Sequence, residues 1–84
     1  MIATAVEAVR AYEATLRRKS TLPLEQRAIS ESLVISSTDY PGASWAWLYS
    51  VAPSGDVWLL DFAGARATRA DAEREVLRTW REQR

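Results

Sequence analysis

The sequence predicts one α+β domain over residues 1–84. The expected fold has two layers in the order α-β-β-β-α, with a three-stranded antiparallel sheet and both helices packed on one face. Three observations predict it: an apolar stripe at helical spacing near each end of the chain, alternating apolar segments between them, and two turn signals that separate those segments. Because two helical stripes need a surface to cover, a single sheet face is the simplest arrangement.

The first helix is expected over residues 2–18. Its apolar residues recur every three or four positions and form one face, which consists of Ile2, Ala5, Val6, Val9, Tyr12 and Leu16. The basic cluster at 17–19 suits a helix C-terminus, where the backbone dipole favours cations. Residues 20–27 then form a connector, in which Pro23 either disfavours helical angles at Leu22 or begins a short helical turn.

The segment 28–38, AISESLVISST, is ambiguous. Ile29, Leu33 and Ile35 share one parity and serines dominate the other, which is typical of a strand with one solvated face. A helix over residues 24–33 is the competing interpretation. We favour a strand from about Ser32 onward, because the stretch LVIS is rich in β-branched residues.

The next two strands form a predicted hairpin. DYPG at 39–42 and APSGD at 52–56 are turn signals. The second strand, Ser44–Val51, lies between these two turns, and the third strand, Val57–Phe62, follows the second turn. The length of the second loop decides which side chains share a face, since a shift of one residue exchanges the faces. With a two-residue loop, Ser54-Gly55, Trp47 lies opposite Phe62 and all the large rings gather in the core.

A three-residue loop, Pro53-Ser54-Gly55, gives the other register. Leu48 then faces Leu60 on the core side, which consists of Ala46, Leu48, Trp58, Leu60 and Phe62. The side away from the core gathers Trp45, Trp47, Tyr49, Val51, Val57, Leu59 and Asp61. Turn chemistry favours this loop, because proline suits the first turn position and glycine suits a left-handed bulge. Burial in the core, which is the commoner role of such rings in a small domain, stays open as the alternative.

A loop over residues 63–68 leads to the last helix. Thr68 is a suitable N-cap, and Asp71 three residues later approximates a capping box. The apolar face of this helix consists of Ala72, Val76, Leu77 and Trp80.

The composition argues against several kinds of chemistry. The chain contains no cysteine and no histidine, so it lacks the usual zinc ligands and the usual general base near neutral pH. The sequence also holds no glycine-rich phosphate loop, and we expect no enzyme activity, no cofactor and no metal. Its apolar runs are too short for a membrane helix, and residues 1–16 lack the features of a signal peptide. We therefore expect a cytoplasmic protein without a membrane partner.

Charge is distributed unevenly, although the formal net charge is zero. Residues 20–62 carry five acidic residues and one arginine, whereas residues 63–84 carry six arginines and four acidic residues. An acidic and aromatic sheet face suits a protein partner with a basic surface. The candidate partner-binding residues are Trp45, Trp47, Tyr49, Asp56 and Asp61.

The function that such a face favours is non-catalytic protein–protein interaction. Small cofactor-free proteins of this kind often act as inhibitors, and the size and charge layout suit an inhibitor of a larger host-defence complex, such as an anti-CRISPR protein. A phage-encoded inhibitor would act in the host cytoplasm. An adaptor or a self-associating subunit, such as a homodimer, is the alternative role.

The predicted order of elements, with GARATRADAEREVL opening the last helix, also resembles the layout of double-stranded-RNA-binding domains. This resemblance implies nucleic-acid binding through Arg66 and Arg69. In that family the start of the last helix carries lysines that contact phosphates, whereas residues 68–73 hold one arginine and two acidic residues. Residues 44–62 contain no lysine or arginine, so nucleic acid is disfavoured as a partner.

Overall fold

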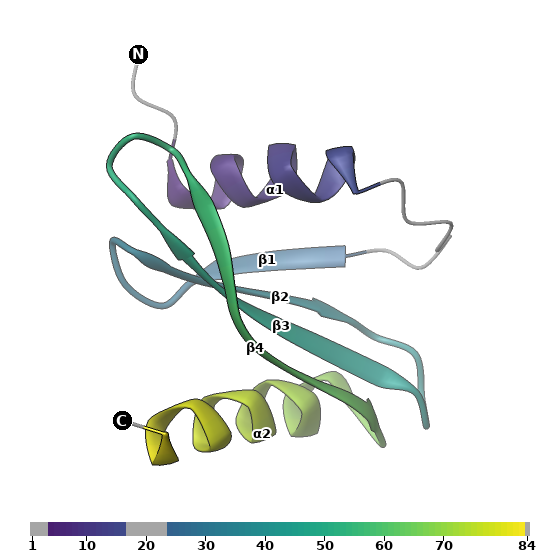
Figure 1. The fold of residues 1–84 in the computed structure, drawn as a ribbon. Coiled ribbons are helices and arrows are strands. Elements are labelled where there is room, and N and C mark those ends of the chain that lie inside the picture. The colour runs from purple at the N-terminus through teal and green to yellow at the C-terminus, as the bar shows by residue number, and fades with distance from the viewer. Residues whose placement is uncertain (1–3, 17–23, 84) are drawn as a thin grey trace.

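The computed structural model describes residues 4–16 and 24–83, which form an α+β fold with two helices and a four-stranded antiparallel sheet (Figure 1). The elements are α1 (Ala5–Thr15), β1 (Leu24–Ala28), β2 (Leu33–Thr38), β3 (Ser44–Val51), β4 (Val57–Arg66) and α2 (Arg69–Glu82). The strands lie in the order β1-β2-β3-β4, so each pairs with the next one along the chain. The predicted α+β class is confirmed.

The prediction of three strands is wrong, because a further strand, β1, occupies residues 24–28, of which 24–27 had been assigned to a connector. β1 pairs antiparallel with β2, which begins at Leu33. The alternative of a helix over residues 24–33 is therefore wrong as well. The sequence of β1, LEQRA, lacks the alternating apolar pattern that predicts a strand. Its polar side chains contact polar groups of the two helices instead of packing in an apolar core.

The two helices pack on opposite faces of the sheet (Figure 1), so the prediction that they share one face is also wrong. Under α1, Val9 packs with Val34 and Tyr49. Under α2, the buried cluster consists of Ile35, Ala46, Leu48, Ala63, Ala72 and Val76. Val34 and Ile35 are consecutive and fully buried, and successive strand residues point to opposite faces. Both faces of the sheet therefore have an apolar surface for a helix to cover.

Glu13 connects α1 to three strands. Its side chain accepts hydrogen bonds from Gln26 Nε2 on β1 (3.0 Å), Ser36 Oγ on β2 (2.9 Å) and Tyr49 Oη on β3 (3.0 Å). Glu13 is only 7% exposed, and a buried carboxylate is costly unless it is hydrogen-bonded. These three donors offset that cost and fix the position of α1 on the sheet.

Ser36 and Ser37 are neighbours on β2, but they bond to different helices. Ser36 donates to Glu13 on α1, as described above, and Ser37 Oγ donates to Glu73 Oε2 on α2 at 2.7 Å. Both serines are fully buried. Because adjacent strand residues point to opposite faces, this pair provides one polar attachment on each side of the sheet.

Both helices begin at a threonine N-cap. Thr4 and Glu7 form a complete capping box at α1, with bonds of 3.1 and 3.4 Å. At α2 the predicted N-cap is confirmed, since the N–H of Asp71 donates to Thr68 Oγ1 at 3.1 Å. The predicted basic cluster and the proline of the connector fall within residues 17–23, outside the described residues.

The β3–β4 loop has the three-residue form that turn chemistry favours. The N–H of Gly55 donates to the carbonyl of Ala52 at 2.9 Å, and the N–H of Ala52 donates to the carbonyl of Asp56 at 2.9 Å. Gly55 has a φ of +93°, in the left-handed region that suits glycine. Val51 pairs with Val57 directly after the loop, so the predicted start of the hairpin is confirmed.

Candidate functional site

The two edges of the sheet differ in length and chemistry. β1 has five residues, LEQRA, whereas β4 has ten, VWLLDFAGAR. Short, charged edges such as β1 resist pairing with another chain, and long apolar edges do not. Four large apolar side chains of β4 are exposed: Trp58 (54%), Leu59 (46%), Leu60 (38%) and Phe62 (54%). We call these four residues the β4 apolar edge.

A β-bulge at Leu60 sets the pairing of β4 with β3. Tyr49 pairs with Leu59, and the next residue of β3, Leu48, pairs with Asp61, so Leu60 is the extra residue. The predicted pairing of Leu48 with Leu60 is therefore wrong. Bulges bend and twist the strand that contains them, and β4 curves strongly across the sheet in Figure 1.

Because of the bulge, Asp61 and Phe62 each lie on the face opposite to the one they would occupy in an uninterrupted strand. Asp61 lies opposite Leu48, on the face that α2 covers, and Phe62 lies opposite Trp47, on the face that carries α1. The three-residue loop had predicted the reverse placement. As a result, a ring lies beside Trp47 where uninterrupted pairing would have placed a carboxylate.

Three rings form an aromatic stack, defined as Trp45, Trp47 and Phe62, on the α1 face. The centroid of Trp45 lies 6.0 Å from that of Trp47 and 6.0 Å from that of Phe62, with interplanar angles of 17° and 14°. Gly64 leaves room for this arrangement, because a Cβ at that position would collide with the indole of Trp45. Trp45 is 36% exposed and Phe62 54%, so part of this apolar surface faces solvent.

The backbone of β4 alternates between bonding to β3 and pointing outward. Ala52 and Asp56 form a hydrogen-bonded pair at the loop. The next pair, Val51–Val57, is then of the non-hydrogen-bonded kind, and so is the pair that contains Leu59. The N–H and C=O groups of Val57 and Leu59 therefore point to the free edge of the sheet, where another strand could bond to them.

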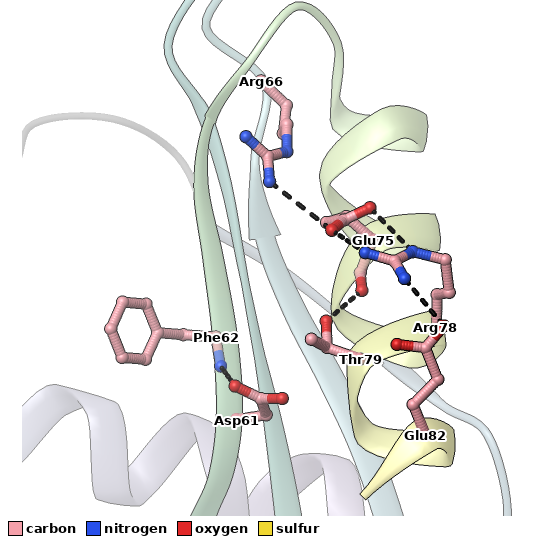
Figure 2. A network of polar contacts seen from close by, with 7 residues as sticks. All are labelled: Asp61, Phe62, Arg66, Glu75, Arg78, Thr79 and Glu82. Carbon is pink, nitrogen blue, oxygen red and sulfur yellow. Dashed lines mark hydrogen bonds and ion pairs between the residues drawn. The ribbon is translucent and has the colours of Figure 1, made fainter.

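Asp61 caps this edge at one position (Figure 2). The N–H of Phe62 donates to Asp61 Oδ1 at 2.8 Å. Past the bulge, Phe62 belongs to a non-hydrogen-bonded pair with Trp47, so its N–H also points outward. The carboxylate of Asp61 thus takes the place that a carbonyl of a further strand would have, and the uncapped part of the edge is Val57–Leu60.

An ion-pair cluster lies beside the far end of β4 (Figure 2). Arg66 Nη2 lies 3.6 Å from Glu75 Oε1, and Arg78 donates to Glu75 and, at 2.8 Å, to Glu82 Oε1. The hydrogen bond from Arg78 lowers the pKa of Glu75 below its ordinary value, and the same bond raises the pKa of Arg78. The arginine charge on this side is therefore largely compensated within the fold.

The predicted partner-binding residues lie in three different settings. Trp45 and Trp47 belong to the aromatic stack, Asp56 is exposed in the β3–β4 loop, and Asp61 caps β4. Tyr49 is fully buried, so the expectation that it lies on an uncovered face is wrong. The reason is that α1 covers this part of the face, which the prediction had left open.

The two arginines of the nucleic-acid alternative both face glutamates. Arg66 pairs with Glu75, and Arg69 Nη1 lies 3.0 Å from Glu25 Oε2 on β1. The four-stranded sheet between two helices also departs from the α-β-β-β-α layout that suggested double-stranded-RNA-binding domains. Neither the charge nor the architecture favours that likeness.

Sequence reasoning missed the outward side chains of β4. Trp58, Leu60 and Phe62 were expected on the core side, yet all three are exposed. One signal was present in the sequence: the adjacent leucines in WLLDF interrupt strict alternation, and such an interruption is typical of a bulge. The edge position of β4, which leaves these side chains uncovered, depends on the order of the strands and has no local signal.

Neither a search for other kinds of site nor a comparison with known proteins adds a second candidate site. Among residues 4–16 and 24–83, no group of three or more metal-ligating side chains is arranged to hold an ion, and no helix there is long and apolar enough to cross a membrane. No protein-family model, no curated protein and no solved structure matches this chain. The fold and the site together define a small α+β domain with one open, apolar sheet edge.

Proposed function

We propose that this protein is a non-catalytic protein-binding module that holds its partner along the free edge of β4. The observation that carries this proposal is the contrast between the two sheet edges. β1 is short and polar, whereas β4 presents four exposed large apolar side chains on a ten-residue strand. An edge of this kind is a template for strand addition, in which main-chain hydrogen bonds provide affinity and side chains provide specificity.

The backbone supports the same proposal. Val57 and Leu59 direct their N–H and C=O groups away from β3, so an added strand gains hydrogen bonds to both residues. The positions of these donors and acceptors are fixed by pairing with β3, which reduces the entropy lost on binding.

The aromatic stack enlarges the binding surface on the α1 face. Trp45 and Phe62 are held by stacking and by the close approach of Trp45 to Gly64. Rigid rings supply contact area at a low cost in conformational entropy, and aromatic residues dominate binding energy at many interfaces. The exposed parts of both rings lie beside β4, so one partner can contact the backbone edge and the rings together.

An inhibitory or adaptor role fits a module that holds a strand. A domain of 84 residues that covers an extended segment of a larger protein prevents that segment from reaching its usual contacts. We favour an inhibitor of a larger complex, such as a host-defence complex, over an adaptor. The sheet formed by the described residues has one long apolar edge, β4, whereas its other edge, β1, is short and charged.

Substitution of exposed β4 side chains tests the proposal. The partner is purified from cells that express the protein, and its affinity is measured for the wild type and for a Trp58→Ala, Phe62→Ala double variant. We expect affinity to fall by about 10- to 100-fold, while the far-UV circular dichroism and the thermal transition stay close to wild type because both rings are 54% exposed.

The matched control is Tyr40→Ala. Tyr40 is 52% exposed but lies in the β2–β3 loop, outside the β4 apolar edge. It should leave the affinity unchanged. Equal affinity for the double variant and the wild type, with both folded, would exclude β4 as the binding edge.

A further inference from the structure

We infer that the segment bound by β4 is an extended, apolar stretch of another protein with a lysine or arginine near each end. This inference rests on the proposed function and specifies the chemistry of the partner. The uncapped edge, Val57–Leu60, carries no charge of its own, and an aspartate stands directly at each end of it, Asp56 and Asp61.

Neither aspartate is neutralised by a cation within the part of the chain that the structure describes. Asp56 Oδ2 accepts a hydrogen bond from Ser54 Oγ at 2.9 Å, and the carboxylate of Asp61 accepts from the N–H of Phe62 at 2.8 Å and from Gln83 Nε2 at 3.5 Å. All of these donors are uncharged. Other acidic residues of the domain, such as Glu25, Glu73 and Glu75, lie in ion pairs with arginines.

The cap at Asp61 defines where an added strand must stop. Its carboxylate occupies the outward position at Phe62 N–H, so a strand that pairs with Val57 and Leu59 meets a negative charge at that end. At the other end, the chain turns away at the β3–β4 loop beside Asp56. The binding edge is therefore short and has the same sign of charge at both ends.

The spacing of the two carboxylates sets the spacing of the partner's cations. Asp61 lies five positions after Asp56 in the sequence, and the segment between them, which contains one bulge, spans about 14–17 Å. An added strand covers that distance in about four to six residues. We therefore expect lysine or arginine residues at that separation, with large apolar side chains between them to pack on Trp58 and Leu59.

The same charges argue against a second copy of this chain as the partner. If two copies paired antiparallel along Val57–Leu60, Asp56 of one copy would approach Asp61 of the other, at both ends of the shared edge. Like charges directly across a strand pair are destabilising. A basic segment removes this repulsion and gains attraction in its place.

A displayed library of random decapeptides, selected against the immobilised full chain, tests the inference. We expect the enriched peptides to contain alternating apolar residues with lysine or arginine four to six positions apart. One enriched peptide is then synthesised with a fluorescent label, and its affinity is measured by anisotropy over a range of salt concentrations. For an Asp56→Asn, Asp61→Asn double variant we expect binding to weaken about tenfold and to depend less on salt.

The amide substitutions are chosen to retain the local structure. An asparagine oxygen can still accept from Phe62 N–H and from Ser54, so these changes remove charge but not the cap. Asp39→Asn, in the exposed β2–β3 loop, is the matched control and should bind like the wild type. Enriched peptides that lack basic residues, or that bind the double variant as tightly as the wild type, would overturn the inference about charge.

Leu59→Pro separates that result from failure of the proposed function. Proline is tolerated on an edge strand where its nitrogen faces solvent, and here it removes an outward donor, whereas Leu59→Ala removes the side chain and retains the donor. Peptides that bind Leu59→Pro as well as Leu59→Ala do not add to β4, and both proposals then fail. If Leu59→Pro does not fold, peptides N-methylated at alternate residues provide the same comparison. A wild-type dimer that dissociates in Leu59→Lys would instead identify a second copy as the occupant and overturn the inference.

Discussion

The hydroxyl of Tyr49 donates a hydrogen bond to the carboxylate of Glu13 at 3.0 Å, beneath α1. Both residues are buried, and Tyr12 lies edge-on to Tyr49 with ring centroids 5.7 Å apart. The bond joins the first helix to the third strand, which are 36 residues apart in the sequence. Removal of one partner in such a buried network leaves the other groups without their acceptor or donor, which costs more than the bond itself contributes.

We therefore expect Glu13→Ala to destabilise the fold by about 2–4 kcal/mol, because Ser36 and Tyr49 lose a buried acceptor. Glu13→Gln retains one acceptor oxygen and should cost about half as much. Urea unfolding followed by circular dichroism measures both. The control is Glu31→Ala, at an exposed position between β1 and β2, which should change stability by less than about 0.5 kcal/mol. Equal losses for Glu13→Ala and Glu31→Ala would show that the network contributes nothing.

Gly64→Ala should displace Trp45 from the aromatic stack, because the new Cβ would collide with the indole ring. We expect a loss of about 1–3 kcal/mol from overpacking and a clear change in the near-ultraviolet circular dichroism, which reports on ring packing. Gly42→Ala is the control: Gly42 has a φ of +80° and open space around its Cα. It should lose about 1–2 kcal/mol through backbone strain and leave the near-ultraviolet spectrum intact. An unaltered spectrum for Gly64→Ala would contradict the stack.

The ion pair of Glu75 with Arg78 should make stability depend on pH. The hydrogen bond from Arg78 lowers the pKa of Glu75 below its ordinary value of 4.5. A depressed pKa contributes stability that is present above 4.5 and is lost as the pH falls through the lower, folded-state pKa. The urea midpoint of Glu75→Gln should therefore lie below that of the wild type at pH 7, and the difference should shrink as the pH drops below 4.5. A difference that stays constant from pH 7 to pH 3 would argue against this pairing in solution.

Local signals in the sequence were sufficient for several elements. The bounds of β3, Ser44–Val51, are those predicted, and the DYPG turn is present, with Ala43 N–H bonded to the carbonyl of Tyr40 at 2.8 Å and Gly42 at positive φ. The apolar face of α2 is also as predicted. In these cases the deciding information lies within a few residues, in turn chemistry or in a helical period.

The other features depend on contacts that are distant in sequence. The side chains of β1 are polar and pair with charged groups on both helices. Those partners are distant in sequence, so residues 20–27 taken alone predict a connector and not a strand. The bulge at Leu60 changes which face Asp61 and Phe62 occupy, and its stability depends on packing across the sheet. Of the predicted binding residues, Trp45 and Trp47 share a face and Asp56 lies at the loop, as the sequence indicated. The sequence misplaced Tyr49 and Asp61, and it missed Trp58, Leu60 and Phe62 as exposed groups. Leu59, which was expected on the side away from the core, is exposed.

The adjacent serines of β2 have a consequence for how the two sides of the sheet are coupled. Ser36 bonds to Glu13 of α1 and Ser37 bonds to Glu73 of α2, so one dipeptide of an inner strand carries an attachment to each helix. A displacement of β2 along its own axis would disturb both attachments together. The positions of the two helices, which lie on opposite faces, are therefore mechanically linked through a single strand.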